Sequence, residues 1–154
     1  MAYVLGQRSQ KKLEGVHPDL VKVVQRAIQI TPIDFSVVDG LRTMAEQIAY
    51  VKSGASQTLD SRHLTGHAVD LTAWVGQKIR WELDLLCKIA SAMRSAANES
   101  GISLRWGANW DILLTDSDSP TEDIVQEYIR NRINAGRKPF VDAPHFELPR
   151  TKYP

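Results

Sequence analysis

The sequence predicts an α+β domain in which a small, mostly antiparallel sheet is flanked by helices. Helical and strand-like hydrophobic patterns follow one another in mixed order along the 154 residues. Mixed order is typical of α+β folds rather than of a regular doubly wound sheet. The strands late in the chain lie close together in sequence, which favours antiparallel pairing because a parallel pair needs a long crossover.

In the first third of the chain, two helices are predicted on either side of a short strand. Residues 17–30 place apolar side chains on one helical face, with Pro18 in the first turn and Thr31-Pro32 after the end. Residues 33–38 form the strand. The second helix opens at Thr43, which has Glu46 three residues later in a capping box, and it stops at Gly54.

The middle of the chain is predicted to contain a loop, a strand and the longest helix. The loop covers residues 55–65, and residues 66–71 alternate as a strand does. Residues 79–100 carry apolar side chains at helical spacing, and Gly101 follows them.

The last third adds two strands and a helix. Strands are predicted at residues 102–106 and 144–148. Between them, Ser119 and Glu122 form a second capping box with Pro120 at the first helical position, and the helix ends near Gly136.

The length and composition predict one globular domain over residues 1–154. Apolar residues make up 43% and the net charge is +1, so no basic excess indicates a nucleic-acid partner. A single cysteine, Cys87, excludes a disulfide framework and a cysteine-based zinc site. No apolar run indicates a signal peptide or a stable membrane association.

Two short segments place histidines beside carboxylates. His63 ends a polar loop, and Asp70 follows seven residues later between Val69 and Leu71. An isolated charge in such an apolar strand is costly, so Asp70 must be paired or bind a metal. The second segment places His145 three residues after Asp142.

Together these residues make a catalytic type of metal set. Two histidines and one carboxylate are a common zinc site with a place left for water, and a nearby carboxylate can take the proton of that water. Each residue alone is weak evidence for a metal site, since a lone histidine is more often a core residue and a lone aspartate is often paired with arginine.

The run from Ser61 through His63, Gly66 and Ala68 to Asp70 resembles the motif of the zinc D-Ala-D-Ala carboxypeptidase and L-alanyl-D-glutamate endopeptidase family, in its phage endolysin branch. Three other segments agree with this family: residues 39–47 with Arg42, residues 106–110 from Trp106 to Trp110, and residues 142–147. The resemblance spans most of the chain, about residues 13–148, and implies a single zinc peptidase domain with no separate cell-wall-binding domain.

The resemblance implies a hedgehog and D,D-peptidase type of fold and a role for each residue at a matching position. His63, Asp70 and His145 would bind one catalytic zinc ion. Asp142 would be the general base. Arg42 would stabilise the developing negative charge or bind a substrate carboxylate.

The remaining candidates have weaker assignments. Ser61 is expected to support the substrate or the metal loop, and Gln47 and Glu147 to support the ligands from behind. Trp106 and Trp110 could be core or could wall the substrate cleft. Ala108 stands where many relatives have glycine, which affects the backbone path there.

The acidic side chains of residues 111–123 could in principle bind calcium, but they lack the spacing of a calcium-binding loop. We interpret it as a solvated loop that leads into a helix, where acidic side chains are favoured.

The resulting hypothesis is a phage endolysin that cuts peptidoglycan stem peptides, most readily at the L-alanyl-D-glutamate bond, and lyses the host. It would wait in the host cytoplasm, depend on a holin for release, act in the periplasm and be a monomer. The alternatives are a D-alanyl-D-alanine carboxypeptidase or dipeptidase, and a non-catalytic peptidoglycan-binding domain of the same fold.

Overall fold

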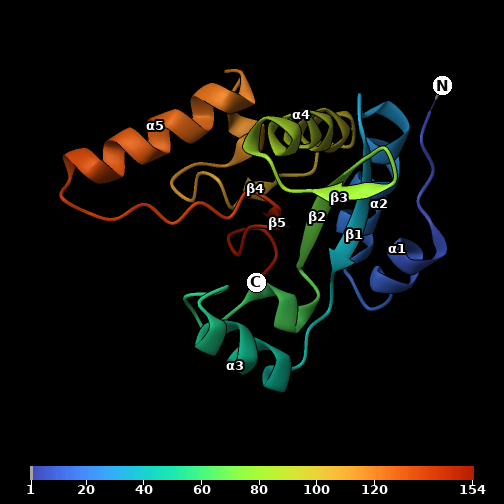
Figure 1. Cartoon of the computed structure of the whole chain (residues 1–154), viewed down its shortest axis with the longest axis horizontal. Helices are drawn as coiled ribbons and strands as arrows, with labels where there is room; N and C mark the ends of the chain where they lie inside the picture. Colours follow the sequence, from blue (N-terminus) through green and yellow to red (C-terminus); the bar gives the residue numbers. More distant parts are fainter. Residues whose placement is uncertain (1) are drawn as a thin grey trace.

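The structure is a computed structural model that describes residues 2–154, and it has the predicted α+β architecture (Figure 1). A five-stranded sheet runs in the order β1-β2-β5-β4, and β3 pairs with the C-terminal end of β2, residues 73–75. Every pairing is antiparallel, which confirms the predicted sheet. The strands are β1 (Asp34–Asp39), β2 (Ala68–Val75), β3 (Lys78–Arg80), β4 (Arg105–Trp106) and β5 (His145–Glu147).

Over residues 2–154, five α-helices and two short 3-10 helices accompany this sheet. They are α1 (Gln7–Lys12), α2 (Pro18–Ile30), α3 (Met44–Ser53), α4 (Leu83–Glu99), α5 (Thr121–Asn134), η1 (Arg62–Thr65) and η2 (Leu114–Asp116). In residues 2–154, none of the helices is long and apolar enough to cross a membrane.

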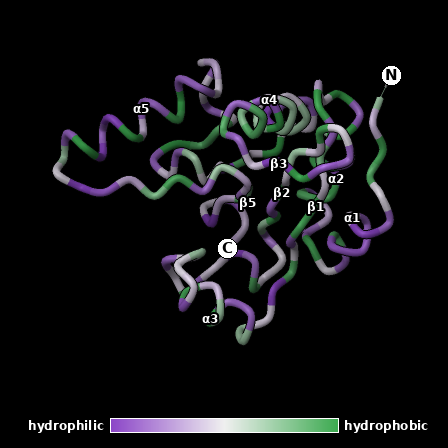
Figure 2. Tube along the Cα trace, viewed as in Figure 1, coloured by the Kyte–Doolittle hydropathy of each residue, from purple (hydrophilic) through white to green (hydrophobic). Residues whose placement is uncertain are grey.

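The core lies where α2 and α4 pack on the sheet and on each other. The apolar stripe of α2, which includes Leu20, Val23 and Val24, is fully buried, and α4 buries Ile89 and Met93 in the same core. Burial of each such side chain contributes roughly 1.5–3 kcal/mol. Figure 2 shows hydrophobic colour over α4, whereas α1 is mostly hydrophilic.

The predicted helix ends are confirmed where a local cap defines them. Thr43 and Glu46 form both halves of the capping box of α3, and Gly54 closes this helix with a left-handed φ of 83°. Pro18 opens α2, and Thr31 follows its last residue in an extended conformation.

The long helix predicted over residues 79–100 is wrong at its start. Gly76 and Gln77 both adopt positive φ, and they form a tight turn from which β3 pairs back onto β2. The helix α4 therefore begins only at Leu83, after this hairpin.

The start of α5 and the strand before it also differ from the prediction. Pro120 is the N-cap of α5 and no side chain caps it, so the second capping box does not form. Instead, the Thr121 hydroxyl donates to the carbonyl of Cys87 and ties α5 to α4. The predicted strand 102–106 pairs only over β4, and α1 was not predicted.

The register of the sheet aligns three polar residues across neighbouring strands. Asp70 on the central strand β2 is the partner of Asp39 on β1 and of His145 on β5. Residues from three distant parts of the chain thereby meet at one end of the sheet.

Candidate active site

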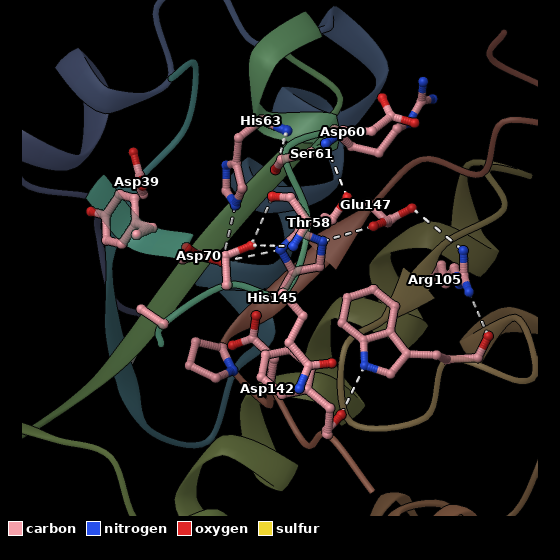
Figure 3. Close-up of a pocket in the computed structure, with 18 of the residues that line it drawn as sticks. Asp39, Thr58, Asp60, Ser61, His63, Asp70, Arg105, Asp142, His145 and Glu147 are labelled. Atoms are coloured by element: carbon pink, nitrogen blue, oxygen red, sulfur yellow. Dashed lines mark hydrogen bonds and ion pairs between the residues drawn. The ribbon is translucent and has the colours of Figure 1, made fainter. Parts of the chain in front are cut away.

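The three predicted metal ligands converge at this end of the sheet (Figure 3). His63 is carried by η1, Asp70 by β2 and His145 by β5. The Asp70 carboxylate oxygen Oδ1 lies 3.3 Å from His63 Nε2 and 3.3 Å from His145 Nδ1. One ligand atom from each residue lies within 4.8 Å of the other two.

Hydrogen bonds behind the ligands fix which nitrogen of each imidazole points inward. His63 Nδ1 lies 2.8 Å from the carbonyl oxygen of Gly40, which can only accept, so Nδ1 carries the proton. His145 Nε2 lies 2.8 Å from the carboxylate oxygen Oε1 of Glu147, so in His145 it is Nε2 that donates a proton. His63 Nε2 and His145 Nδ1 are thus directed at Asp70. Carboxylate and carbonyl partners of this kind orient metal-binding histidines.

Two of the inward atoms lack a hydrogen-bond partner although they are buried. These atoms are His63 Nε2 and Asp70 Oδ1, which lie close together but are not aligned as a hydrogen bond. Buried polar atoms are nearly always paired, so unpaired ones need an explanation. A metal ion held by two imidazoles and one carboxylate satisfies both atoms and leaves a coordination position open.

The segment that carries His63 is held by local contacts. The Ser61 hydroxyl accepts a hydrogen bond from the His63 amide at 3.2 Å, which caps η1. Gly66 ends η1 with a φ of 76°, and a side chain there would collide with the carbonyl oxygen of Gly15. Ser61 therefore holds the loop that carries His63, which is compatible with one of its two predicted roles.

The charges of the site are strongly coupled. Burial raises the pKa of Asp70, but His145 and His63 outweigh it and hold this pKa well below its usual range. Burial lowers the pKa of His145, but its contacts with Asp70 and Glu147 raise it to about 10. Burial likewise opposes ionisation of Glu147, and the contact with His145 still keeps its pKa low. The carboxylates around His145 therefore favour a positive charge at this point of the site.

Asp142 lies beside His145 on the wall of the cleft (Figure 3). Burial raises its pKa to about 6, which is a suitable value for a group that exchanges protons near neutral pH. Its amide donates to the carbonyl of Gly107 at 2.8 Å. A side chain at Gly107 would collide with the Asp142 carbonyl, so this close approach requires glycine.

Arg42 lies behind Asp70 and connects it to other residues. Its guanidinium donates to Asp70 Oδ2 at 3.2 Å, to Asp39 at 2.5 and 2.9 Å and to Gln47 Oε1 at 2.6 Å. It also lies over the ring of Tyr50 at 4.2 Å. The predicted support by Gln47 thus reaches Asp70 through Arg42.

The ligands open into a cleft of about 880 Å³. Trp110 lines it, with its ring stacked on Phe140 and 5.2 Å from the ring of His145. Trp106 is only 1% exposed, stacks on Phe146 and donates its indole N–H to Ala143. This burial contradicts the prediction that Trp106 contacts substrate and favours its alternative role in the core.

Ala108, which departs from the family motif, is fully buried in the core. The turn around it closes through a hydrogen bond from the Asn109 amide to the Trp106 carbonyl. Asp111 in the acidic stretch forms an ion pair with Arg132 at 2.6 Å.

Three residues at the site were missed in the sequence. Asp39 anchors Arg42, Phe140 stacks on Trp110, and Arg105 lies 3.8 Å from Glu147. Asp39 directly precedes the Gly40–Arg42 segment, so its role could have been suspected from its position next to this motif. Arg105 and Phe140 lie in segments with no local motif and become visible only through long-range contacts.

The chain resembles known proteins over nearly its whole length. A family model described as phage L-alanyl-D-glutamate peptidase matches residues 1–149. The L-alanyl-D-glutamate peptidase of Escherichia phage T5 is 37% identical over 115 residues, which are 72% of this chain and 84% of that protein. The L-alanyl-D-glutamate peptidase of Listeria phage A118 is 31% identical over 78 residues, 51% of this chain and 27% of that longer protein.

A solved structure agrees with the sequence relatives. The crystal structure of the L-Ala D-Glu endopeptidase ChiX of Serratia marcescens superposes with a TM-score of 0.75 and 39% identity, over 98% of this chain and 94% of that one. The chain described here belongs to the phage L-alanyl-D-glutamate peptidase family.

Proposed function

We propose that the protein is a zinc-dependent endolysin that hydrolyses the L-alanyl-D-glutamate bond of peptidoglycan stem peptides. The observation that carries the proposal is the convergence of His63, Asp70 and His145 on one point, with two buried ligand atoms left unpaired. The names of its relatives support the choice of bond.

The metal would be held by His63 Nε2, His145 Nδ1 and the Asp70 carboxylate. Zinc in such a set acts as a Lewis acid that polarises a peptide carbonyl and makes water more acidic. Zinc is favoured over magnesium or calcium because imidazole ligands suit it, whereas those two ions prefer oxygen ligands.

Asp142 would act as the proton carrier of the reaction. Its carboxylate lies on the cleft wall next to His145 and has a pKa raised to about 6. It would take a proton from the attacking water and then give this proton to the leaving amine. Both transfers need a group that is neither too acidic nor too basic at the pH of the reaction.

Arg42 is proposed to act on the site in two ways. Its hydrogen bond to Asp70 orients this ligand, and its place on the cleft wall keeps a positive charge near the reacting carbonyl. Such a fixed charge stabilises the developing oxyanion. Ser61 and Trp110 would position the peptide along the two walls of the cleft.

The biological setting belongs to the same proposal. The phage origin of its relatives supports a role on the bacterial cell wall. The enzyme would be made in the host cytoplasm and reach the wall with the help of a holin. We propose that residues 1–154 act as one catalytic domain and as a monomer.

Digestion of purified peptidoglycan tests the proposal. The zinc-loaded protein should release new N-terminal D-glutamate, detected by mass spectrometry of the products, and a chelator should abolish this release until zinc is added back. Release of free D-alanine instead would establish a carboxypeptidase. Wall binding without any product would establish a non-catalytic module.

A further inference from the structure

The cleft has more positive than negative side chains. Its lining includes seven basic residues, Arg42, Arg62, Arg105, Arg132, Arg137, Lys138 and Arg150, and five acidic ones, Asp39, Asp60, Asp70, Asp142 and Glu147. The whole chain is close to neutral at +1, so the excess is a property of this surface.

Most of these cations already have partners within the protein. Arg42 is bound to Asp39 and Asp70, and Arg62 donates to the carbonyls of Leu148 and Tyr153. The remaining partnered cations form the ion pairs Arg105–Glu147, Arg132–Asp111 and Arg150–Asp60. These residues serve the fold or the metal site.

Arg137 and Lys138 differ from the other cations of the cleft. Both side chains are exposed, and neither makes an ion pair or side-chain hydrogen bond with any residue between 2 and 154. They are neighbours on the segment that joins α5 to Asp142, and both line the cleft with Asp142.

The backbone holds this segment in place although its two cations are unpaired. The Arg137 amide donates to the Arg132 carbonyl at 2.8 Å, and the Asp142 amide donates to Gly107 at 2.8 Å. Between these two points, the Phe140 carbonyl accepts the indole N–H of Trp110 at 2.9 Å. The two cations are therefore presented from an anchored segment.

We infer that Arg137 and Lys138 bind the carboxylates that the stem peptide carries on the leaving side of the scissile bond. The inference rests on the proposed function. It adds that the enzyme prefers stem peptides whose carboxylates are free over stem peptides whose carboxylates are amidated.

The chemistry of the substrate places anions on this side. In a stem peptide, the side-chain carboxyl of D-glutamate forms the next peptide bond. Its α-carboxylate therefore stays free, next to the nitrogen of the scissile bond. The diamino acid that follows adds further carboxylates. Asp142 gives its proton to the leaving nitrogen, so the leaving half of the peptide lies along the wall that carries Asp142. Arg137 and Lys138 belong to that wall.

The test uses two synthetic stem peptides, L-alanyl-γ-D-glutamyl-diaminopimelic acid with its carboxylates free and the same peptide with them amidated. The variant is the double substitution Arg137→Gln and Lys138→Gln. The matched control is Lys22→Gln with Lys88→Gln, because these two lysines are exposed on α2 and α4, lie outside the cleft lining and change the net charge equally.

The parent and the control should cleave the free peptide with a lower KM than the amidated peptide. In the double variant, KM for the free peptide should rise roughly three- to tenfold, as expected for two solvent-exposed charge contacts, with kcat unchanged. KM for the amidated peptide should stay the same, so the preference disappears.

Two results would contradict the inference, and they are distinguishable from failure of the proposed function. If the double variant keeps the preference of the parent, or if the control loses it as well, Arg137 and Lys138 do not recognise the carboxylates. If the zinc-loaded parent leaves both peptides intact, the proposed function itself is wrong and the inference falls with it.

Discussion

Asp142 combines a raised pKa with a position on the cleft wall beside His145. Replacement by asparagine keeps its size and removes its capacity to carry a proton. We expect Asp142→Asn to lower kcat/KM by roughly 10²- to 10⁴-fold, the usual contribution of a general base, while the protein still binds one equivalent of zinc. Peptidoglycan cleavage and metal analysis on the same sample measure both quantities.

Asp118→Asn is the matched control for this variant, because Asp118 is exposed in the acidic stretch and outside the cleft. It should retain the activity of the parent. An Asp142→Asn protein that cleaves walls at the parental rate would show that another group carries the proton.

If His145 is a zinc ligand as proposed, zinc binding should depend on pH through this residue. Its pKa is raised to about 10 in the metal-free protein, so at pH 7 it holds a proton that zinc must displace. Raising the pH weakens this competition. Zinc affinity should therefore increase as the pH rises from 6 to 8, by about tenfold per pH unit for one displaced proton.

Titration calorimetry in buffers of different ionisation enthalpy measures the displaced proton directly. We expect roughly one proton per zinc from His145 at pH 7. His67→Gln should leave this number unchanged, since His67 contacts Thr65 and His17 rather than the metal site. Zinc binding without any proton release would contradict a protonated His145.

At the scale of single residues, the sequence could predict the metal set because its members lie in recognisable motifs. His63 and Asp70 share one segment, and Asp142 and His145 share another. The role of Trp106 could not be decided in the same way. A tryptophan in a strand fits the core or a cleft, and only the packing against Phe146 decides for the core.

Among the elements, α3 is held to the rest of the protein in an unusual way. Gln47 is its one buried residue, and Figure 1 shows the helix beyond the end of β1. Gln47 accepts from Arg42 and donates to the Ser56 hydroxyl at 2.9 Å and to the Thr58 carbonyl at 2.5 Å. One amide therefore joins α3 and the loop after it to the arginine behind Asp70.

Gln47→Ala should loosen this wall of the cleft. Loss of the amide removes the acceptor of Arg42 Nη1 and the donor to the Thr58 carbonyl. An unpaired polar group of this kind costs about 1–3 kcal/mol of unfolding free energy. Hydrogen exchange over residues 44–60 should accelerate more than exchange in α2 and α4. Urea denaturation measures the global loss, and mass spectrometry of exchanged peptides measures the local one.

Gln25→Ala is the corresponding control, because Gln25 is an exposed glutamine on α2. It should change neither the free energy of unfolding nor hydrogen exchange over residues 44–60 by more than surface substitutions usually do. If Gln47→Ala behaves like Gln25→Ala, the hydrogen bonds of Gln47 do not hold α3 in place.

Local signals explain which element boundaries the sequence could predict. The ends of α3 depend on Thr43, Glu46 and Gly54, which act within a few residues of the helix. The start of α4 depends on pairing of β3 with β2, and a helical pattern in residues 79–82 conceals that pairing. The missing cap at Ser119 has a similar cause, since Thr121 bonds to Cys87 of another helix.

At the scale of the whole molecule, the site exists because three separate elements meet. The sheet register sets Asp70 opposite both Asp39 and His145, and η1 brings His63 over them. Sequence patterns predict an antiparallel sheet but do not give its register, so the convergence had to come from family resemblance. The structure supplies the distances on which the chemistry depends.

Whether these three side chains bind one metal ion can be measured directly. A crystal of the zinc-loaded protein, with diffraction data collected on both sides of the zinc absorption edge, locates every bound zinc ion. We expect one strong anomalous peak, from a zinc ion bonded to His63 Nε2, His145 Nδ1 and the Asp70 carboxylate at zinc–ligand distances of about 2.0–2.2 Å. A peak elsewhere, or no peak between these three side chains at saturating zinc, would contradict it.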